Sequence, residues 1–147
     1  MSLDVLNSKI LKCLQQNARL SNAEIGRRVG VSSPAVSERI KKMEDMGIIE
    51  DYKAIVSPFE IGYQLKAIIT LRAFMGKLKP FLEKVKTYDE VVNCYRITGD
   101  ENIVMEVVLK NHSHLEIFID QLISYGETKT QIVLSRVVKQ KEIIPIK

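Results

Sequence analysis

The chain has 147 residues, of which 46% are hydrophobic and 27% are charged. This composition is typical of one globular domain or two small ones and excludes an intrinsically disordered protein. No apolar run approaches the roughly 18 residues that a membrane-spanning helix needs, and the first residues lack the pattern of a secretory signal. The net charge of +4 is mild, so it permits nucleic-acid binding without proving it. Two cysteines form no disulfide framework, so we expect a cytoplasmic protein without a membrane partner.

Two helices are predicted in the first thirty residues. The first is predicted by apolar residues at helical spacing, which are Leu3, Leu6, Ile10, Cys13 and Leu14. Ser21 to Glu24 has the pattern of a capping box, with Ser21 as the N-cap of a short second helix. Gly30 ends that helix, because glycine adopts the left-handed backbone conformation without steric cost.

A third helix is predicted to begin at Ser32 and Pro34, since a serine cap followed by proline in the first turn is a helix start. Its buried face carries Val36, Ile40 and Met43, and Gly47 ends it. Two helices joined by a tight turn and supported by a preceding helix describe a helix-turn-helix.

The outward face of the third helix carries groups that suit DNA. We expect base contacts from Ser33, Ser37 and Lys41, and phosphate contacts from Arg27, Arg28, Arg39 and Lys42. Ser32 and Glu38 flank this face and complete the predicted DNA-binding set. The alternative is an ordinary three-helix bundle with solvated charges, and the ordered spacing of the caps and the turn favours DNA binding.

The rest of the chain predicts a hinge and an α+β domain. Residues 48–56 alternate as a strand does and are followed by Ser57-Pro58. Beyond them, strands are predicted over residues 67–74, 91–98, 103–109 and 130–138. Helices are predicted around residues 78–85 and 115–123, the second opened by a capping box from Ser113 to Glu116. The order βαββαβ describes a ferredoxin-like sheet with two helices on one face.

The strands over residues 91–97 and 103–109 are largely apolar on both faces. A sheet covered by helices on one side only is expected to alternate with polar residues on the other side. We therefore predict a homodimer in which two sheets pack together, with Cys94 at that interface. The segment from Lys139 to the C-terminus is predicted to form an edge strand or a second-subunit arm.

The sequence resembles the Lrp/AsnC family of transcription regulators along nearly its whole length. In the first half the resemblance rests on Leu3-Asp4, on Arg19 to Ile25, on Val29 to Ser32 and on Arg39 to Ile49. In the second half it rests on Ile97-Thr98-Gly99-Asp100 and on Thr128 to Thr130. The resemblance implies an N-terminal winged helix-turn-helix in residues 1–50, a strand-containing hinge in 51–65, and a ferredoxin-like ligand-binding and oligomerisation domain in 66–147.

The resemblance also implies partners. These are double-stranded DNA, a free amino acid that binds between dimers as effector, and further copies of the chain in homodimers that assemble into octamers. No cofactor is expected. The implied effector pocket consists of Thr98, Gly99, Asp100, Asn102, Glu127, Thr128 and Thr130. Many members continue Gly-Asp-x-Asp-Tyr, whereas this chain has Asn102 and Ile103 at the last two positions, so the usual ligand preference does not transfer. A plain hairpin turn at Gly99-Asp100 is the alternative.

Two further functions stay open. An enzyme similar to siroheme decarboxylases shares this two-domain fold, but only His112 and His114 are available to it, and their spacing does not suit a helical metal pair. A scaffold that binds an amino acid but no DNA would use the same second domain. No catalytic or metal-binding motif is found, so we expect a regulator rather than an enzyme.

Overall fold

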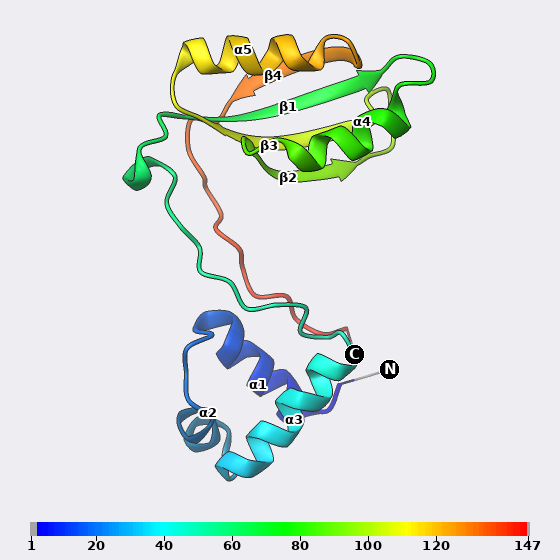
Figure 1. Ribbon diagram of the computed structural model, residues 1–147. Helices are drawn as coiled ribbons and strands as arrows, with labels where there is room; N and C mark the ends of the chain where they lie inside the picture. Colours follow the sequence, from blue (N-terminus) through cyan, green and yellow to red (C-terminus); the bar gives the residue numbers. More distant parts are fainter. Residues whose placement is uncertain (1–2, 147) are drawn as a thin grey trace. The chain divides into compact units, whose positions relative to one another are not determined.

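The computed structural model describes residues 3–146, which form two compact units (Figure 1). The first unit contains the residues up to Ala54 together with the segment from Val138 onward, and the second contains Ile55–Val137. The prediction placed the C-terminal segment in the second domain, whereas the structure places it in the first unit. No helix among the described residues has the length and apolarity needed to cross a membrane.

The first unit consists of α1 (Val5–Gln16), α2 (Asn22–Val29) and α3 (Ser33–Asp45), which confirm the three predicted helices. Each helix begins at a side-chain cap: Asp4, Ser21 and Ser32 accept backbone N–H bonds from the third residue on. The core between the helices consists of buried apolar residues, which are Ile10, Leu11, Ile25, Val36 and Met43.

The turn between α2 and α3 is tight and closed by backbone hydrogen bonds. Gly30 has φ +83°, and its N–H donates to the Gly26 carbonyl at 2.8 Å, while the Val31 N–H donates to the same oxygen at 3.0 Å. A Cβ on Gly26 would collide with the carbonyl oxygen of Val31. The turn that sets the direction of α3 relative to α2 therefore depends on a glycine at position 26 as well as at position 30.

The second unit contains β1 (Leu65–Ala73), α4 (Leu78–Lys84), β2 (Val91–Arg96), β3 (Ile103–Leu109), α5 (His112–Leu122) and β4 (Gly126–Ile132), with 3-10 turns at Phe59–Ile61 and Val85–Thr87. The strands form one antiparallel sheet in the order β2-β3-β1-β4. The predicted βαββαβ order is therefore confirmed. Helices α4 and α5 cover one face of the sheet (Figure 1).

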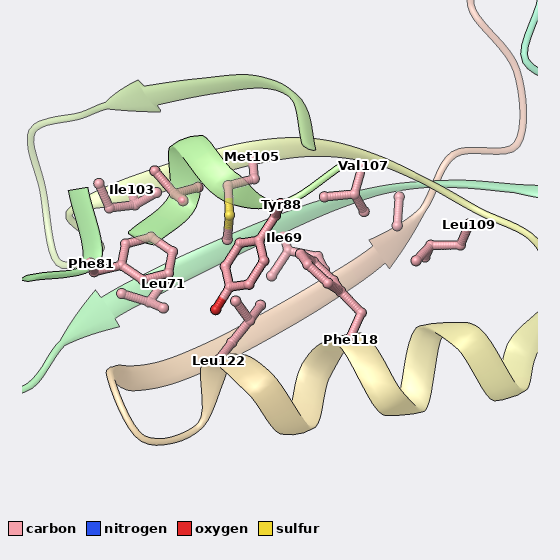
Figure 2. Close-up of a cluster of buried hydrophobic side chains, with 12 residues drawn as sticks. Ile69, Leu71, Phe81, Tyr88, Ile103, Met105, Val107, Leu109, Phe118 and Leu122 are labelled. Carbon is pink, nitrogen blue, oxygen red and sulfur yellow. The ribbon is translucent and has the colours of Figure 1, made fainter. Parts of the chain in front are cut away.

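The core of this unit lies between that face and the two helices, as Figure 2 shows. Ile69 and Leu71 of β1 point toward Phe118 and Leu122 of α5. The rings of Tyr88 and Phe118 meet edge to face at 5.3 Å between centroids. Burial of this apolar surface stabilises the packing of the sheet against its two helices. The opposite face of the sheet has no helix over it.

The largest differences from the prediction concern the boundaries of two elements and one strand that does not form. β4 begins at Gly126 and ends at Ile132, rather than spanning residues 130–138, because its polar alternation is that of an edge strand paired to β1 alone. Helix α5 begins at His112, since Asn111 caps it by accepting the His114 N–H at 2.9 Å. In the single chain described, residues 48–56 form no strand, because no partner strand pairs with them.

The C-terminal segment contacts α1 of the same chain instead of forming an edge strand. The Gln15 side-chain amide accepts the Ile143 N–H at 2.8 Å and donates to the Ile143 carbonyl at 3.1 Å. Gln16 donates to the Glu142 carboxylate at 2.7 Å. The second unit is thus joined to the first by two stretches of chain, one before β1 and one after β4.

Candidate functional site

The surface of α3 matches the predicted arrangement of polar groups. Val36 and Met43 are buried in the core, while Ser37, Glu38, Lys41 and Lys42 are exposed. Ser33 is half-buried at the start of the helix, and the Ser32 hydroxyl accepts the Ala35 N–H at 3.4 Å as the N-cap. One face of this helix therefore offers hydroxyl and ammonium groups to a partner.

Most cations near this face already have an acidic partner. Arg27 and Arg28 both pair with Glu24 on α2, and their guanidinium groups lower the pKa of the Glu24 carboxyl, with Arg27 the larger cause. Lys42 pairs with Glu38 at 3.1 Å, one turn away. Among the described residues, Lys41 has no ion-pair partner. Surface pairs of this kind contribute little to stability, so these cations can exchange a carboxylate for a phosphate at little cost.

Arg39 differs from the other predicted phosphate contacts. It is one-third exposed, and its guanidinium donates to Asp4 at 2.7 Å and to Asn7 at 2.9 Å. Both acceptors belong to the N-terminal end of α1. The side chain is therefore directed at the neighbouring helix.

Lys41 and Ser37 border a cavity of about 590 Å³ in the first unit. Leu14, Leu20 and Ile40 contribute apolar surface to it. Tyr52 also lines this open depression, and its hydroxyl donates to the Glu44 carboxylate at 2.8 Å. Burial and this carboxylate raise the pKa of Tyr52 to about 12, so the hydroxyl stays protonated and holds the chain after α3 in place.

The β2–β3 turn in the second unit holds the predicted effector residues Thr98, Gly99 and Asp100, all exposed. Gly99 has φ +109°, a backbone conformation that glycine adopts without steric cost. No atom lies within 4 Å of the position that a Cβ would take there. Asn102 ties the turn to the sheet: its N–H donates to Leu71 at 3.0 Å, and its side-chain oxygen accepts the Ala73 N–H at 2.7 Å.

Two ion pairs accompany this turn. Lys129 of β4 donates to Glu101 at 2.7 Å, and this bond lowers the pKa of the Glu101 carboxyl and raises the pKa of the lysine. Arg72 of β1 donates to Glu127 of β4 at 2.7 Å. Arg72, Glu127 and Lys129 are exposed, whereas the Glu101 side chain is about three-quarters buried. Pairs with an exposed partner contribute little to stability, so a ligand with its own charged groups can displace them.

The comparison with known proteins identifies both units. Residues 3–50 match the family described as Winged helix-turn-helix DNA-binding, and residues 66–143 match the Lrp/AsnC ligand binding domain. The chain belongs to the Lrp/AsnC family. It is a DNA-binding transcriptional regulator of that type, and neither alternative function is favoured by these matches.

Relatives within the Lrp/AsnC family match over nearly the full chain. The HTH-type transcriptional regulator FL11 of Pyrococcus furiosus is 32% identical, over 99% of this chain and 97% of its own length. The regulator Ptr1 of Methanocaldococcus jannaschii is 34% identical, over 98% and 99%. A similar solved structure is the transcriptional regulator NMB0573/L-Met complex from Neisseria meningitidis, with a TM-score of 0.91 and 28% identity over 97% of this chain and 96% of that one.

The structure separates the implied effector residues of this Lrp/AsnC chain into two groups. Thr128 and Thr130 pair across from Leu71 and Ile69, so they face the helix-covered side. Glu127 faces the open side of the sheet with Arg72. The β2–β3 turn is brought to the same strand through the Glu101–Lys129 pair.

Arg72, Glu101 and Lys129 lie beside the predicted effector residues but are not among those predicted from the sequence. For Lys129 the sequence contains a usable pattern, because the alternation from Gly126 to Thr130 puts residues 127 and 129 on one face of a strand. The late predicted start of β4 concealed it.

Cys94 and His114, two other residues considered in the sequence analysis, have contacts that explain them structurally. Cys94 pairs across from Met105 and packs against the helix-covered core, so its predicted place at an open interface is wrong. His114 lies 2.9 Å from the Glu90 carboxylate and accepts the Lys110 N–H through Nδ1. Among the described residues, no group of His, Cys, Asp or Glu could hold a metal ion.

Proposed function

We propose that this regulator binds its operator by placing α3 in the major groove, with Ser37 and Lys41 reading base edges and Ser33 contacting DNA where the helix begins. The observation that carries the proposal is the exposure of Ser37 and Lys41 opposite the buried Val36 and Met43. A major groove about 12 Å wide accommodates one α-helix, and serine and lysine are donors suited to base edges.

Phosphate contacts in this proposal come from Arg27 and Arg28 of α2 and from Lys42 of α3, with Ser32 and Glu38 flanking them. Their ion pairs with Glu24 and Glu38 lie on the surface of single helices, so phosphates can replace the carboxylates without rearranging the fold. These contacts position the protein and contribute salt-dependent affinity, but they read no sequence.

Replacing Ser37 and Lys41 together by alanine tests the reading role of α3. We expect operator affinity to fall about 30-fold or more, because each good base contact contributes roughly 1–3 kcal/mol of discrimination. Fluorescence anisotropy with labelled promoter DNA measures the change. Lys12→Ala on exposed α1 is the matched control, since it also removes one positive charge. Unchanged affinity in the double variant would contradict the reading role of α3, whereas no operator binding by the wild type itself would favour the scaffold.

We further propose that a free amino acid binds at the β2–β3 turn and the adjoining open side of β4. An amino acid carries one ammonium and one carboxylate group. Asp100, Glu101 and Glu127 suit the first, and Arg72 and Lys129 suit the second. The match to the family's ligand-binding domain and the L-Met complex of the Neisseria relative support this proposal. Asn102 is engaged by the Ala73 N–H, so its role is to hold the turn.

Homodimers formed through the open face of the sheet, assembling further into octamers, complete the proposed working form. This face carries Ile68 and Val104 in its centre, with the exposed Tyr95 beside them, and α4 and α5 cover the other side. A dimer would place two copies of α3 in successive major grooves, about 34 Å apart. The named relatives are transcriptional regulators, which supports a regulator without enzymatic activity, acting in the cytoplasm.

A further inference from the structure

The ion pair between Arg39 and Asp4 is unlike the others in the first unit. Of the ion pairs in residues 3–54, those of Arg27, Arg28 and Lys42 each lie within one helix, and the remaining local pair joins Lys53 to Asp51 two positions away. Arg39 and Asp4 are 35 positions apart and connect the middle of α3 to the start of α1. This pair is therefore the one that fixes two helices relative to each other.

Asp4 uses its two carboxylate oxygens for two different tasks. Oδ1 accepts the Asn7 N–H at 2.6 Å and so caps α1, while Oδ2 accepts Arg39 at 2.7 Å. The Asn7 side chain accepts a second bond from the same guanidinium nitrogen. Arg39 thereby holds the capped first turn of α1 against α3. The guanidinium, and next the Asn7 N–H, keep the pKa of Asp4 below its ordinary value.

The helix held in this way is the one proposed to read DNA. At 1.5 Å per residue, α3 is about 20 Å long, so a tilt of about 10° moves its far end by roughly 3 Å. A displacement of that size breaks a hydrogen bond to a base, which tolerates only a few tenths of an ångström. The angle between α1 and α3 consequently matters for sequence reading.

We propose that Arg39 is a positioning residue that sets the angle of α3 against α1 through Asp4 and Asn7, and that it does not contact a DNA phosphate. This replaces the phosphate role expected from the sequence, and it rests on the proposed placement of α3 in the major groove. The wild-type fold keeps the guanidinium one-third exposed and bonded to two acceptors of α1.

Asp4→Asn gives the sharpest test, because asparagine caps a helix as well as aspartate does while losing the charge that holds Arg39. Glu24→Gln is the matched control, since it removes a carboxylate that pairs with Arg27 and Arg28. If Arg39 positions α3, Asp4→Asn weakens operator binding about 5- to 20-fold, whereas Glu24→Gln strengthens it. Stronger binding by Asp4→Asn would overturn the proposal, because it would mean that the released arginine reaches a phosphate.

The salt dependence of operator affinity separates positioning from phosphate contact. Each phosphate contact contributes about 0.9 to the slope of log affinity against log salt concentration. Arg39→Ala is expected to weaken binding at every salt concentration with an unchanged slope, and Lys42→Ala to reduce the slope. Arg39→Lys should bind the operator as weakly as Arg39→Ala, because an ammonium group lacks the planar, forked donor geometry of a guanidinium. A slope reduced by about 0.9 in Arg39→Ala, or rescue by lysine, would contradict the proposal.

Two checks keep these results interpretable. Circular dichroism identifies a temperature at which each variant is folded. If Arg39→Ala does not fold, the operator affinity of Asp4→Asn, which keeps the helix cap, tests the positioning role of Arg39. The combined variant Arg39→Ala/Asp4→Asn should bind the operator no more weakly than Arg39→Ala alone, since Arg39→Ala already removes the bond to Asp4. Failure of the reading role of α3 would instead appear as wild-type affinity in the Ser37/Lys41 variant, so the two failures are distinguishable.

Discussion

Replacing Gly26 by valine is expected to abolish operator binding by unfolding the first unit. A side chain at position 26 meets the backbone carbonyl of Val31, which cannot move without opening the α2–α3 turn. Such a collision costs about 3 kcal/mol or more. A unit of roughly 60 residues has a stability of only about 3–9 kcal/mol at typical values per residue. Thermal unfolding followed by circular dichroism, together with operator titration, measures the loss.

Gly30→Asn is the control for Gly26→Val. Position 30 also belongs to the turn, but its φ is +83° and nothing lies within 4 Å of a Cβ there. Asparagine tolerates that conformation, so this variant should melt near the wild type and bind the operator. The second unit has its own core and should keep its transition in both variants. A Gly26→Val protein that melts and binds like the wild type would refute the role given to this close contact.

Replacing Val104 by aspartate is expected to dissociate the proposed dimer. Val104 lies on the open face of β3, opposite Thr70 of β1 and Tyr95 of β2. In a dimer packed through this face, a carboxylate from each copy would be buried without a partner. We expect dimer affinity to fall by at least about 100-fold, or roughly 3 kcal/mol, and operator affinity to fall with it. Light scattering across a dilution series measures the mass.

Ile117→Asp is the matched control, because it makes the same kind of change on the exposed surface of α5. It should leave the dimer intact. Circular dichroism should find both variants folded, since neither position belongs to the buried core. A Val104→Asp protein that stays dimeric at micromolar concentration would move the interface away from the sheet.

Local patterns in the sequence were sufficient for most of the fold. Helical spacing, the Ser21 and Ser32 caps and the Gly30 turn predicted α1 to α3 within about two residues, because each signal depends on neighbours in the chain. The βαββαβ order followed from apolar runs and turn residues in the same way. Edge strand β4 was misplaced because its alternation is polar, and its limits are set by pairing with β1.

The partners of charged groups could not be predicted from local patterns. Arg39 on α3 has the sequence features of a phosphate contact, and only the packing of α1 against α3 reveals Asp4 beside it. In the same way, Glu101 meets Lys129 because the β2–β3 turn folds toward β4. The residue types that favour DNA and amino-acid binding are visible in the sequence, while their pairing depends on tertiary structure.

Sequence-specific regulation controlled by an amino acid is tested most directly by comparing titrations of promoter DNA from the protein's own gene and of a scrambled duplex of equal length. The titrations should be run without ligand and with each of the twenty amino acids, and light scattering should record the mass in parallel. We predict binding to the promoter at least about 100-fold tighter than to the scrambled duplex. At least one amino acid should change that affinity or the assembly. Equal affinity for both duplexes would contradict sequence-specific regulation, and indifference to every amino acid would contradict the proposed effector site.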